Sequence, residues 1–172
     1  MFSLPLVLLV LFINVFGVIG DTPIFATATL HPDSNSSAKG FVIFTQLNPS
    51  SSVVVRGIIN GLVPNTQYHG FHVHEKNPGN TTNCTAAGAH FNPYMKWHGG
   101  PDDTIDQRHV GDLGNIHSNE FGTAYVLIND SIIQLANQTQ SILNRTIIVH
   151  RDVDDLGRGG QVDSNTTGLF YI

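Results

Sequence analysis

Basic side chains are scarce in this chain of 172 residues, which has eight Lys and Arg against 13 Asp and Glu and a formal net charge of −5. Nucleic acid and anionic membrane surfaces select for clustered Lys and Arg. The few basic residues here are scattered along the sequence. The composition therefore argues against nucleic acid or a membrane surface as the main partner.

Long hydrophobic runs are also lacking, with one exception at the N-terminus. Residues 4–19 carry no charge, and residues 18–20 are small or apolar, which suits cleavage by signal peptidase. We therefore expect residues 1–20 to be a secretory signal peptide and residues 21–172 to be a secreted, extracellular domain without stable membrane contact. Because residues 1–3 contain no Lys or Arg, an N-terminal membrane anchor of marginal length is the alternative.

Sites for N-linked glycosylation support export. An Asn-x-Ser/Thr sequence is a possible glycan acceptor on a surface loop of a secreted protein. The chain has seven, which begin at Asn35, Asn80, Asn83, Asn129, Asn137, Asn144 and Asn165. We therefore expect a glycoprotein.

The sequence contains a single cysteine, Cys84. An intramolecular disulfide is impossible, although secreted domains usually pair their thiols. Three alternatives stay open from the residues alone. Cys84 is a buried free thiol, part of an intermolecular bridge, or a residue whose partner has been lost.

Helical periodicity is lacking beyond the N-terminal segment. Short runs rich in Val, Ile, Phe and Thr alternate with turn-forming sequences. Many short strands without intervening helices predict a single all-β domain, an antiparallel sandwich or barrel. The strands are expected at residues 24–30, 41–47, 53–59, 68–74, 124–128 and 146–150, and two long functional loops at residues 75–111 and 151–168.

Histidine, in contrast, is plentiful. In His72-Val73-His74 the two imidazoles are two residues apart, so on a strand they project from the same face about 7 Å apart and can hold one ion. Such a pair alone is more often surface decoration than a metal site. His150 closes an apolar strand and could complete the site from a neighbouring strand.

The long loop supplies a second set of ligands, His90, His98, His109 and Asp112, among Gly and Pro residues that allow tight folding. Three imidazoles and a carboxylate form the tetrahedral shell that zinc takes, whereas four imidazoles near a plane suit Cu(II). A copper site with four imidazoles and a zinc site with four ligands together need eight ligand places, but the chain offers seven candidate residues. The count is met if one imidazole uses both of its nitrogens and bridges the two ions. His90 is the natural bridge.

Five motifs together resemble those of the copper/zinc superoxide dismutase family. They are residues 70–75 (GFHVHE), 84–93 (CTAAGAHFNP), 98–102 (HGGPD), 108–115 (RHVGDLGN) and 149–160 (VHRDVDDLGRGG), in family order. The resemblance implies a Greek-key, immunoglobulin-like β-sandwich or flattened barrel. It also implies copper at His72, His74, His90 and His150, and zinc at His90, His98, His109 and Asp112.

The resemblance further implies that copper redox cycling converts superoxide to oxygen and hydrogen peroxide, with His90 as both ligand and catalytic acid. Zinc would hold the loop and tune His90. Asp154 would link a copper ligand to a zinc ligand. Arg108 and Arg145 would be structural, and His31, His69 and His117 match no ligand.

The end of the sequence departs from the family pattern. After Gly168 the family continues with an arginine at the mouth of the copper channel and a second cysteine, where this chain has residues 169–172 (LFYI). The resemblance therefore implies an unpaired Cys84, a reduced rate, and a stunted final strand that leaves the homodimer in doubt. A secreted, non-catalytic copper/zinc-binding homologue, such as a carrier, buffer or decoy, is the alternative function. A metal-free recognition module would leave all seven ligands unused.

Overall fold

The computed structural model describes residues 22–33, 36–65, 68–79, 81, 83–137, 139–159 and 163–167. Within these ranges no helix has the length and apolar character needed to cross a membrane. The predicted signal peptide and the predicted final strand at residues 169–172 lie outside them. The described elements are β1 (Ile24–Leu30), β2 (Lys39–Gln46), β3 (Val53–Asn60), β4 (Tyr68–His74), the 3-10 helix η1 (Cys84–Ala87), β5 (Asp112–His117), β6 (Ala124–Asp130) and β7 (Thr146–Val149).

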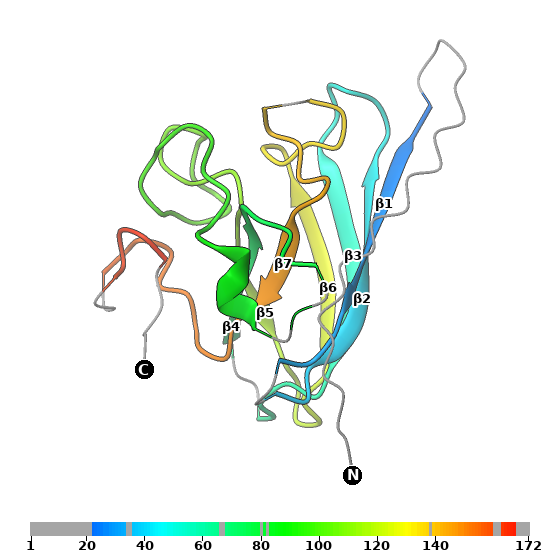
Figure 1. Ribbon diagram of the computed structural model, residues 1–172, viewed down its shortest axis with the longest axis vertical. Coiled ribbons are helices and arrows are strands. Elements are labelled where there is room, and N and C mark those ends of the chain that lie inside the picture. The colour runs from blue at the N-terminus through cyan, green and yellow to red at the C-terminus, as the bar shows by residue number, and fades with distance from the viewer. Residues whose placement is uncertain are drawn as a thin grey trace.

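The strands form two antiparallel sheets that face each other (Figure 1). One sheet has the strand order β1-β2-β3-β6 and the other the order β5-β4-β7. The chain leaves the first sheet after β3, forms β4 and β5, and returns with β6 beside β3, which is a Greek-key connection. The predicted all-β Greek-key sandwich is therefore confirmed.

Alternating side chains explain why the sheets pack. In β2, Val42 and Phe44 are buried while Phe41 and Ile43 face outward. The inward side chains meet the buried Phe71 of β4 in the core between the sheets. Each fully buried side chain of this size contributes roughly 1.5–3 kcal/mol before the entropy cost of folding. The apolar period of two residues therefore fixes which face of each strand lies inside.

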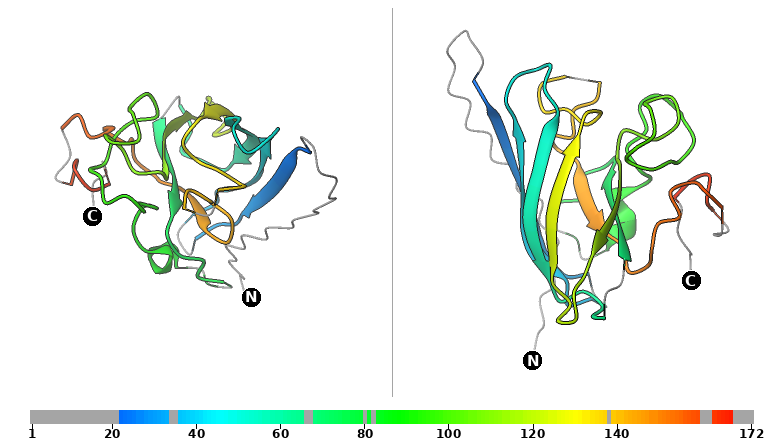
Figure 2. Two further views of the ribbon diagram at one scale, coloured as in Figure 1. Left: turned by 90° about the horizontal axis from the view of Figure 1, so that it is seen from above. Right: turned by 180° about the vertical axis from the view of Figure 1, so that it is seen from behind.

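Strand β4 differs from the others because it is buried on both faces from His69 to His74. It is the central strand of its sheet and pairs with β5 and β7. Figure 2 shows both long loops on the side of this sheet that faces away from β1, β2, β3 and β6. The loops therefore cover the face of β4 that would otherwise meet water.

The predicted strands are all present, with ends that differ by up to two residues. Sequence reasoning missed β5, whose sequence DLGNIH contains Asp, Gly and Asn, residues depleted in strands. Pairing with β4 overrides this weak propensity. It also missed η1, a single turn that Asn83 caps by accepting a hydrogen bond from the Thr85 N–H.

Candidate metal centre

The first ligand group joins His72 and His74 of β4 to His90 of the long loop and to His150, which directly follows β7. One ligand atom from each residue lies within 4.8 Å of the others. The β4–β7 pairing continues through the His150 N–H, which donates to the Gly70 carbonyl at 2.8 Å, and this fixes His150 beside His72. The ring centroids of His72 and His90 are 4.0 Å apart. The four imidazoles therefore converge on one point.

The second group consists of His90, His98, His109 and Asp112, all buried, again with ligand atoms within 4.8 Å of one another. Asp112 begins β5 and lies opposite His72. Its Oδ1 accepts a hydrogen bond from Nδ1 of His90 at 2.8 Å, and its Oδ2 accepts one from the His109 N–H at 2.8 Å. The structure thus brings all seven predicted residues together in two groups, with His90 common to both.

Outer hydrogen bonds orient the imidazoles. Nδ1 of His74 donates to the Gly88 carbonyl at 2.8 Å. Nε2 of His72 and Nε2 of His98 each donate to Asp154 at 2.7 Å, the first to Oδ2 and the second to Oδ1. In a neutral imidazole, a proton on the nitrogen that makes this hydrogen bond leaves the other ring nitrogen with a lone pair. A metal binds to that lone pair.

Three ring nitrogens that face the ligand groups have lone pairs or protons without a hydrogen-bond partner, as a metal site requires. Nδ1 of His72, Nε2 of His90 and Nδ1 of His98 are buried and have no hydrogen-bond partner. Nδ1 of His98 lies 3.0 Å from Oδ2 of Asp112 but is not aligned with it as a hydrogen bond. Each unsatisfied buried group costs about 1–3 kcal/mol. Imidazole nitrogens with one carboxylate suit zinc or copper, so the residues fit such ions.

The four imidazoles of the first ligand group have lowered pKa values, which favours the neutral form that binds a metal cation. Burial is the main cause that lowers the pKa of His72 and His150 well below the ordinary value and that of His74 to about 4. Burial also lowers the pKa of His90, against the opposing effect of its hydrogen bond to Asp112. These four imidazoles are therefore neutral at pH 7, as metal ligands must be.

The second group carries charge of its own. Burial opposes protonation of His98, but the carboxylate of Asp112, 3.0 Å from its Nδ1, and that of Asp154, hydrogen-bonded to its Nε2, outweigh burial and raise the pKa of His98 to about 9. Burial likewise opposes ionisation of Asp112, yet its hydrogen bonds with His109 and His90 and the close imidazole of His98 hold the pKa of Asp112 well below the ordinary value. An entering cation would therefore displace a proton from His98.

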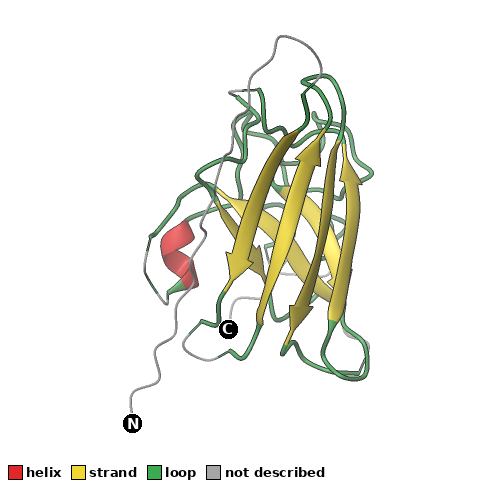
Figure 3. Ribbon diagram, turned by 90° about the vertical axis from the view of Figure 1, so that its right-hand side faces the viewer, coloured by secondary structure: helices red, strands yellow, loops and turns green. Residues whose placement is uncertain are grey.

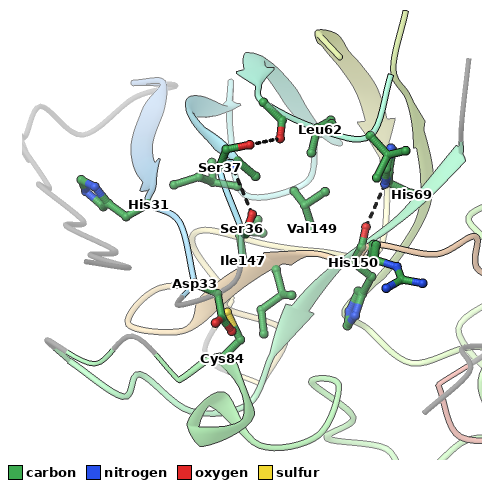
Figure 4. Close-up of a pocket in the computed structure, with 16 residues that line it drawn as sticks. His31, Asp33, Ser36, Ser37, Leu62, His69, Cys84, Ile147, Val149 and His150 are labelled. Atoms are coloured by element: carbon green, nitrogen blue, oxygen red, sulfur yellow. Dashed lines mark hydrogen bonds between the residues drawn. The ribbon is translucent and has the colours of Figure 1, made fainter. Parts of the chain in front are cut away.

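Several supporting groups could not be found from the sequence. Asn115 accepts a hydrogen bond from the Asp154 N–H at 2.9 Å and donates to the Asp154 carbonyl at 2.8 Å, which holds that loop against β5. His69 donates from Nδ1 to the His150 carbonyl at 3.0 Å, a bond drawn in Figure 4. Asn115 stands within one of the five motifs, but only folding shows what it contacts.

Two arginines have the structural roles predicted for them. The buried Arg108 pairs with Asp130 at 2.7 Å, and Arg145 donates to the Glu75 carbonyl at 2.8 Å. The Arg145 guanidinium also lies 3.4 Å above the centre of the Phe91 ring. Both therefore tether the loop that carries the second ligand group.

Cys84 is a free thiol at the start of η1. It lines a cleft of about 530 Å³ together with Leu30 of β1 and Val149 of β7 (Figure 4). Burial, and then the hydrogen bond with Asp33, raise the pKa of the thiol to about 12. Among the described residues Cys84 is therefore a free, partly buried thiol that stays protonated at neutral pH.

Fold and site together define a β-sandwich metalloprotein with two ligand groups that share one histidine. The sequence profile of the copper/zinc superoxide dismutase (SODC) family matches residues 38–169. The chain is 51% identical over 130 residues to Cu-Zn superoxide dismutase 5 of Dictyostelium discoideum, covering 75% of this chain and 81% of that protein. It is 47% identical over 143 residues to the Cu-Zn superoxide dismutase of Yarrowia lipolytica, covering 83% and 88%. The chain belongs to the copper/zinc superoxide dismutase family.

Proposed function

We propose that this protein is a superoxide dismutase that uses copper and zinc to convert superoxide to oxygen and hydrogen peroxide. The observation that carries the proposal is the pair of buried ligand groups that share His90, in a chain of this family. His72, His74, His90 and His150 would hold copper. His90, His98, His109 and Asp112 would hold zinc, because this group supplies the carboxylate that a closed zinc shell accepts.

Copper, when bound, supplies the one-electron oxidation and reduction of superoxide, and zinc supplies a fixed positive charge without redox chemistry. The protein contributes the proton-handling group. Asp112 holds Nδ1 of His90, while Nε2 of His90 is buried and free of other partners. A group that alternately holds and releases a proton at this atom acts as a general acid, so His90 is the proposed catalytic residue.

We further propose that this protein consumes superoxide more slowly than an enzyme whose positive charges attract the anionic substrate to the metal. Six of the eight basic side chains contact acidic groups or backbone carbonyls. The other two, Lys39 and Arg56, lie on the four-stranded sheet. Arg151 follows His150 directly, but its Nε lies 3.4 Å from Oδ1 of Asp152. With a net charge of −5, little positive potential is left to attract an anion.

We also propose that the protein is secreted as a glycoprotein after removal of residues 1–20, with neither nucleic acid nor membrane as a lasting partner. The uncharged N-terminal run and the seven acceptor sequences support export. Expression in eukaryotic cells followed by N-terminal sequencing of the medium fraction tests this. Recovery of an intact N-terminus in a membrane pellet would contradict it, and sedimentation of the secreted protein reports its oligomeric state.

The enzymatic proposal is tested by measuring metal content and superoxide consumption on the same purified sample. We expect about one copper and one zinc per chain, superoxide consumption, and a weak dependence on salt. Asp152→Asn should free Arg151 and raise the rate at low salt by a few-fold, about two- to fivefold. Glu120→Gln, in the exposed turn before β6, makes the same charge change outside both ligand groups and is the control. Both metals bound without superoxide consumption would instead identify a non-catalytic metal-binding homologue.

A further inference from the structure

The outer face of the four-stranded sheet is unusually apolar. The strand register places Phe41, Ile58 and Tyr125 in one row across β2, β3 and β6. Ile43 and Leu127 flank Arg56 in the next row. Tyr125 is 74% exposed and Leu127 71%, so these are not margins of the core. Figure 3 looks onto this sheet, which here forms the front of the molecule.

This face also differs from the rest of the chain in charge. Its charged side chains among the described residues are Lys39 and Arg56, and no carboxylate points outward from these strands. Large exposed apolar areas on soluble proteins usually mark a surface that something else covers. A polar cover anchored on the face itself would meet that need.

Asn129 stands on the same face, at the edge strand β6. It lies opposite Val54 in the row after Leu127, so its side chain projects about 7 Å from that of Leu127. Asn129 is exposed, and its side-chain amide makes no hydrogen bond with the described residues. It begins the acceptor sequence Asn129-Asp130-Ser131. Among the described acceptor asparagines it is the one that lies within a strand.

We propose that an N-linked oligosaccharide on Asn129 covers the apolar outer face of the four-stranded sheet. The inference rests on the proposed secretion, because such glycans are added in the secretory pathway. Nδ2 of Asn129 forms a bond to the anomeric carbon of an oligosaccharide carried on a lipid diphosphate. The bond from that carbon to the diphosphate oxygen breaks, the amide loses one proton and the lipid diphosphate leaves.

The chemistry of the face suits a sugar. The C–H face of a pyranose ring packs against aromatic and aliphatic side chains such as Tyr125 and Leu127, while its hydroxyl groups stay in water. The glycan core starts two residues from Leu127 and can lie back along β6. Asn137, by contrast, is exposed in the loop after β6, beyond a run of buried residues, so a glycan there would point away from the sheet.

The test uses the full chain secreted from eukaryotic cells. Asn129→Gln and Ser131→Ala each abolish the acceptor sequence, and Asn137→Gln removes a loop acceptor as the matched control. Mass spectrometry of glycopeptides should show a glycan on Asn129. Light scattering against concentration should show self-association raised about threefold or more in both Asn129-site variants but not in the control. Adding Tyr125→Ser and Leu127→Ser to Asn129→Gln should reverse the increase.

The outcomes separate this inference from the function on which it rests. An unmodified Asn129 in secreted protein that carries glycans elsewhere overturns the inference and leaves secretion standing. A glycan on Asn129 whose loss changes neither self-association nor binding of an apolar dye also overturns it. A chain retained in the cell without any glycan contradicts the proposed secretion itself, and the inference with it.

Discussion

His72 and His98 belong to different ligand groups, yet both donate hydrogen bonds to the carboxylate of Asp154, each at 2.7 Å. One buried side chain therefore sets the orientation of an imidazole in each group. Asp154 is in turn held by Asn115 of β5. The two groups are thus coupled through a carboxylate as well as through the shared His90.

Replacing Asp154 with Asn should weaken both metal groups. The amide offers one acceptor and one donor, so it cannot accept from both imidazoles, and one ring loses its fixed tautomer. Loss of such an outer contact typically costs 10–100-fold in metal affinity. Competition with a chelator measures it. Asp106→Asn, which removes an exposed carboxylate that pairs with Lys96, is the control. Equal affinities in the two variants would contradict the coupling.

The shared position of His90 predicts a specific pattern of metal loss. His74→Ala should lower occupancy of the first group and His109→Ala that of the second, since each residue contacts one group. His90→Ala should lower both, because it removes a ligand from each. Metal analysis after dialysis distinguishes the three variants. A His90 variant that loses only one metal would show that the imidazole is not shared.

Acid should destabilise the metal-free protein. The pKa of His74 is about 4 in the folded protein, below the ordinary 6.5. As the pH falls from 6.5 to 4, His74 therefore binds a proton in the unfolded chain but not in the folded protein, and this favours unfolding. This imidazole alone lowers the free energy of unfolding by on the order of 3 kcal/mol between pH 6.5 and pH 4. His98, with its raised pKa of about 9, contributes stability that is complete below pH 6.5 and is lost as pH rises through 9.

Urea titrations of chelator-treated protein between pH 9.5 and pH 4.5 test this balance. The free energy of unfolding should peak near pH 6.5–7 and fall on both sides. A free energy that keeps rising from pH 7 to pH 5 would show that the four imidazoles with lowered pKa are not buried in the metal-free state.

Cys84 should react slowly with thiol reagents. Its raised pKa of about 12 leaves almost no thiolate at pH 8, and the thiolate is the nucleophile. Alkylation followed by mass spectrometry should give a rate that is at least tenfold below that of a free peptide thiol. Cys84→Ser should leave the melting temperature nearly unchanged. A large drop, or a dimer lost under reducing conditions, would show that the thiol has a partner.

The Arg108–Asp130 pair should matter more to stability than the surface pair of Arg158 and Asp103. Arg108→Ala leaves a buried carboxylate without its partner, at a cost of about 3–5 kcal/mol. Arg158→Ala removes an exposed partner and should change the free energy of unfolding little. Urea denaturation compares the two. Equal losses would mean that Asp130 is satisfied by the Ile132 and Ile133 N–H groups to which it is also bonded.

Local patterns were sufficient for much of the fold. Buried and exposed side chains alternate in β2, and β7 contains the apolar run Ile147-Ile148-Val149. Each pattern predicts a strand from the local sequence alone, because the two-residue period of side chains is a local property. Strand β5 was missed because its Asp112 and Gly114 oppose strand formation locally. What makes it a strand is its partner β4, which lies about 40 residues away along the chain.

The sequence by itself predicted seven candidate ligands, their order and one shared histidine, since seven residues can fill eight ligand positions only if one of them bridges. Only the tertiary structure decided which nitrogen of each imidazole is free, because that depends on contacts such as Gly88 with His74 and Asp154 with His72. It also decided that Asn129 shares a face with Tyr125 and Leu127. Hydrogen bonds and strand register join residues that are distant in the chain, and no local pattern encodes them.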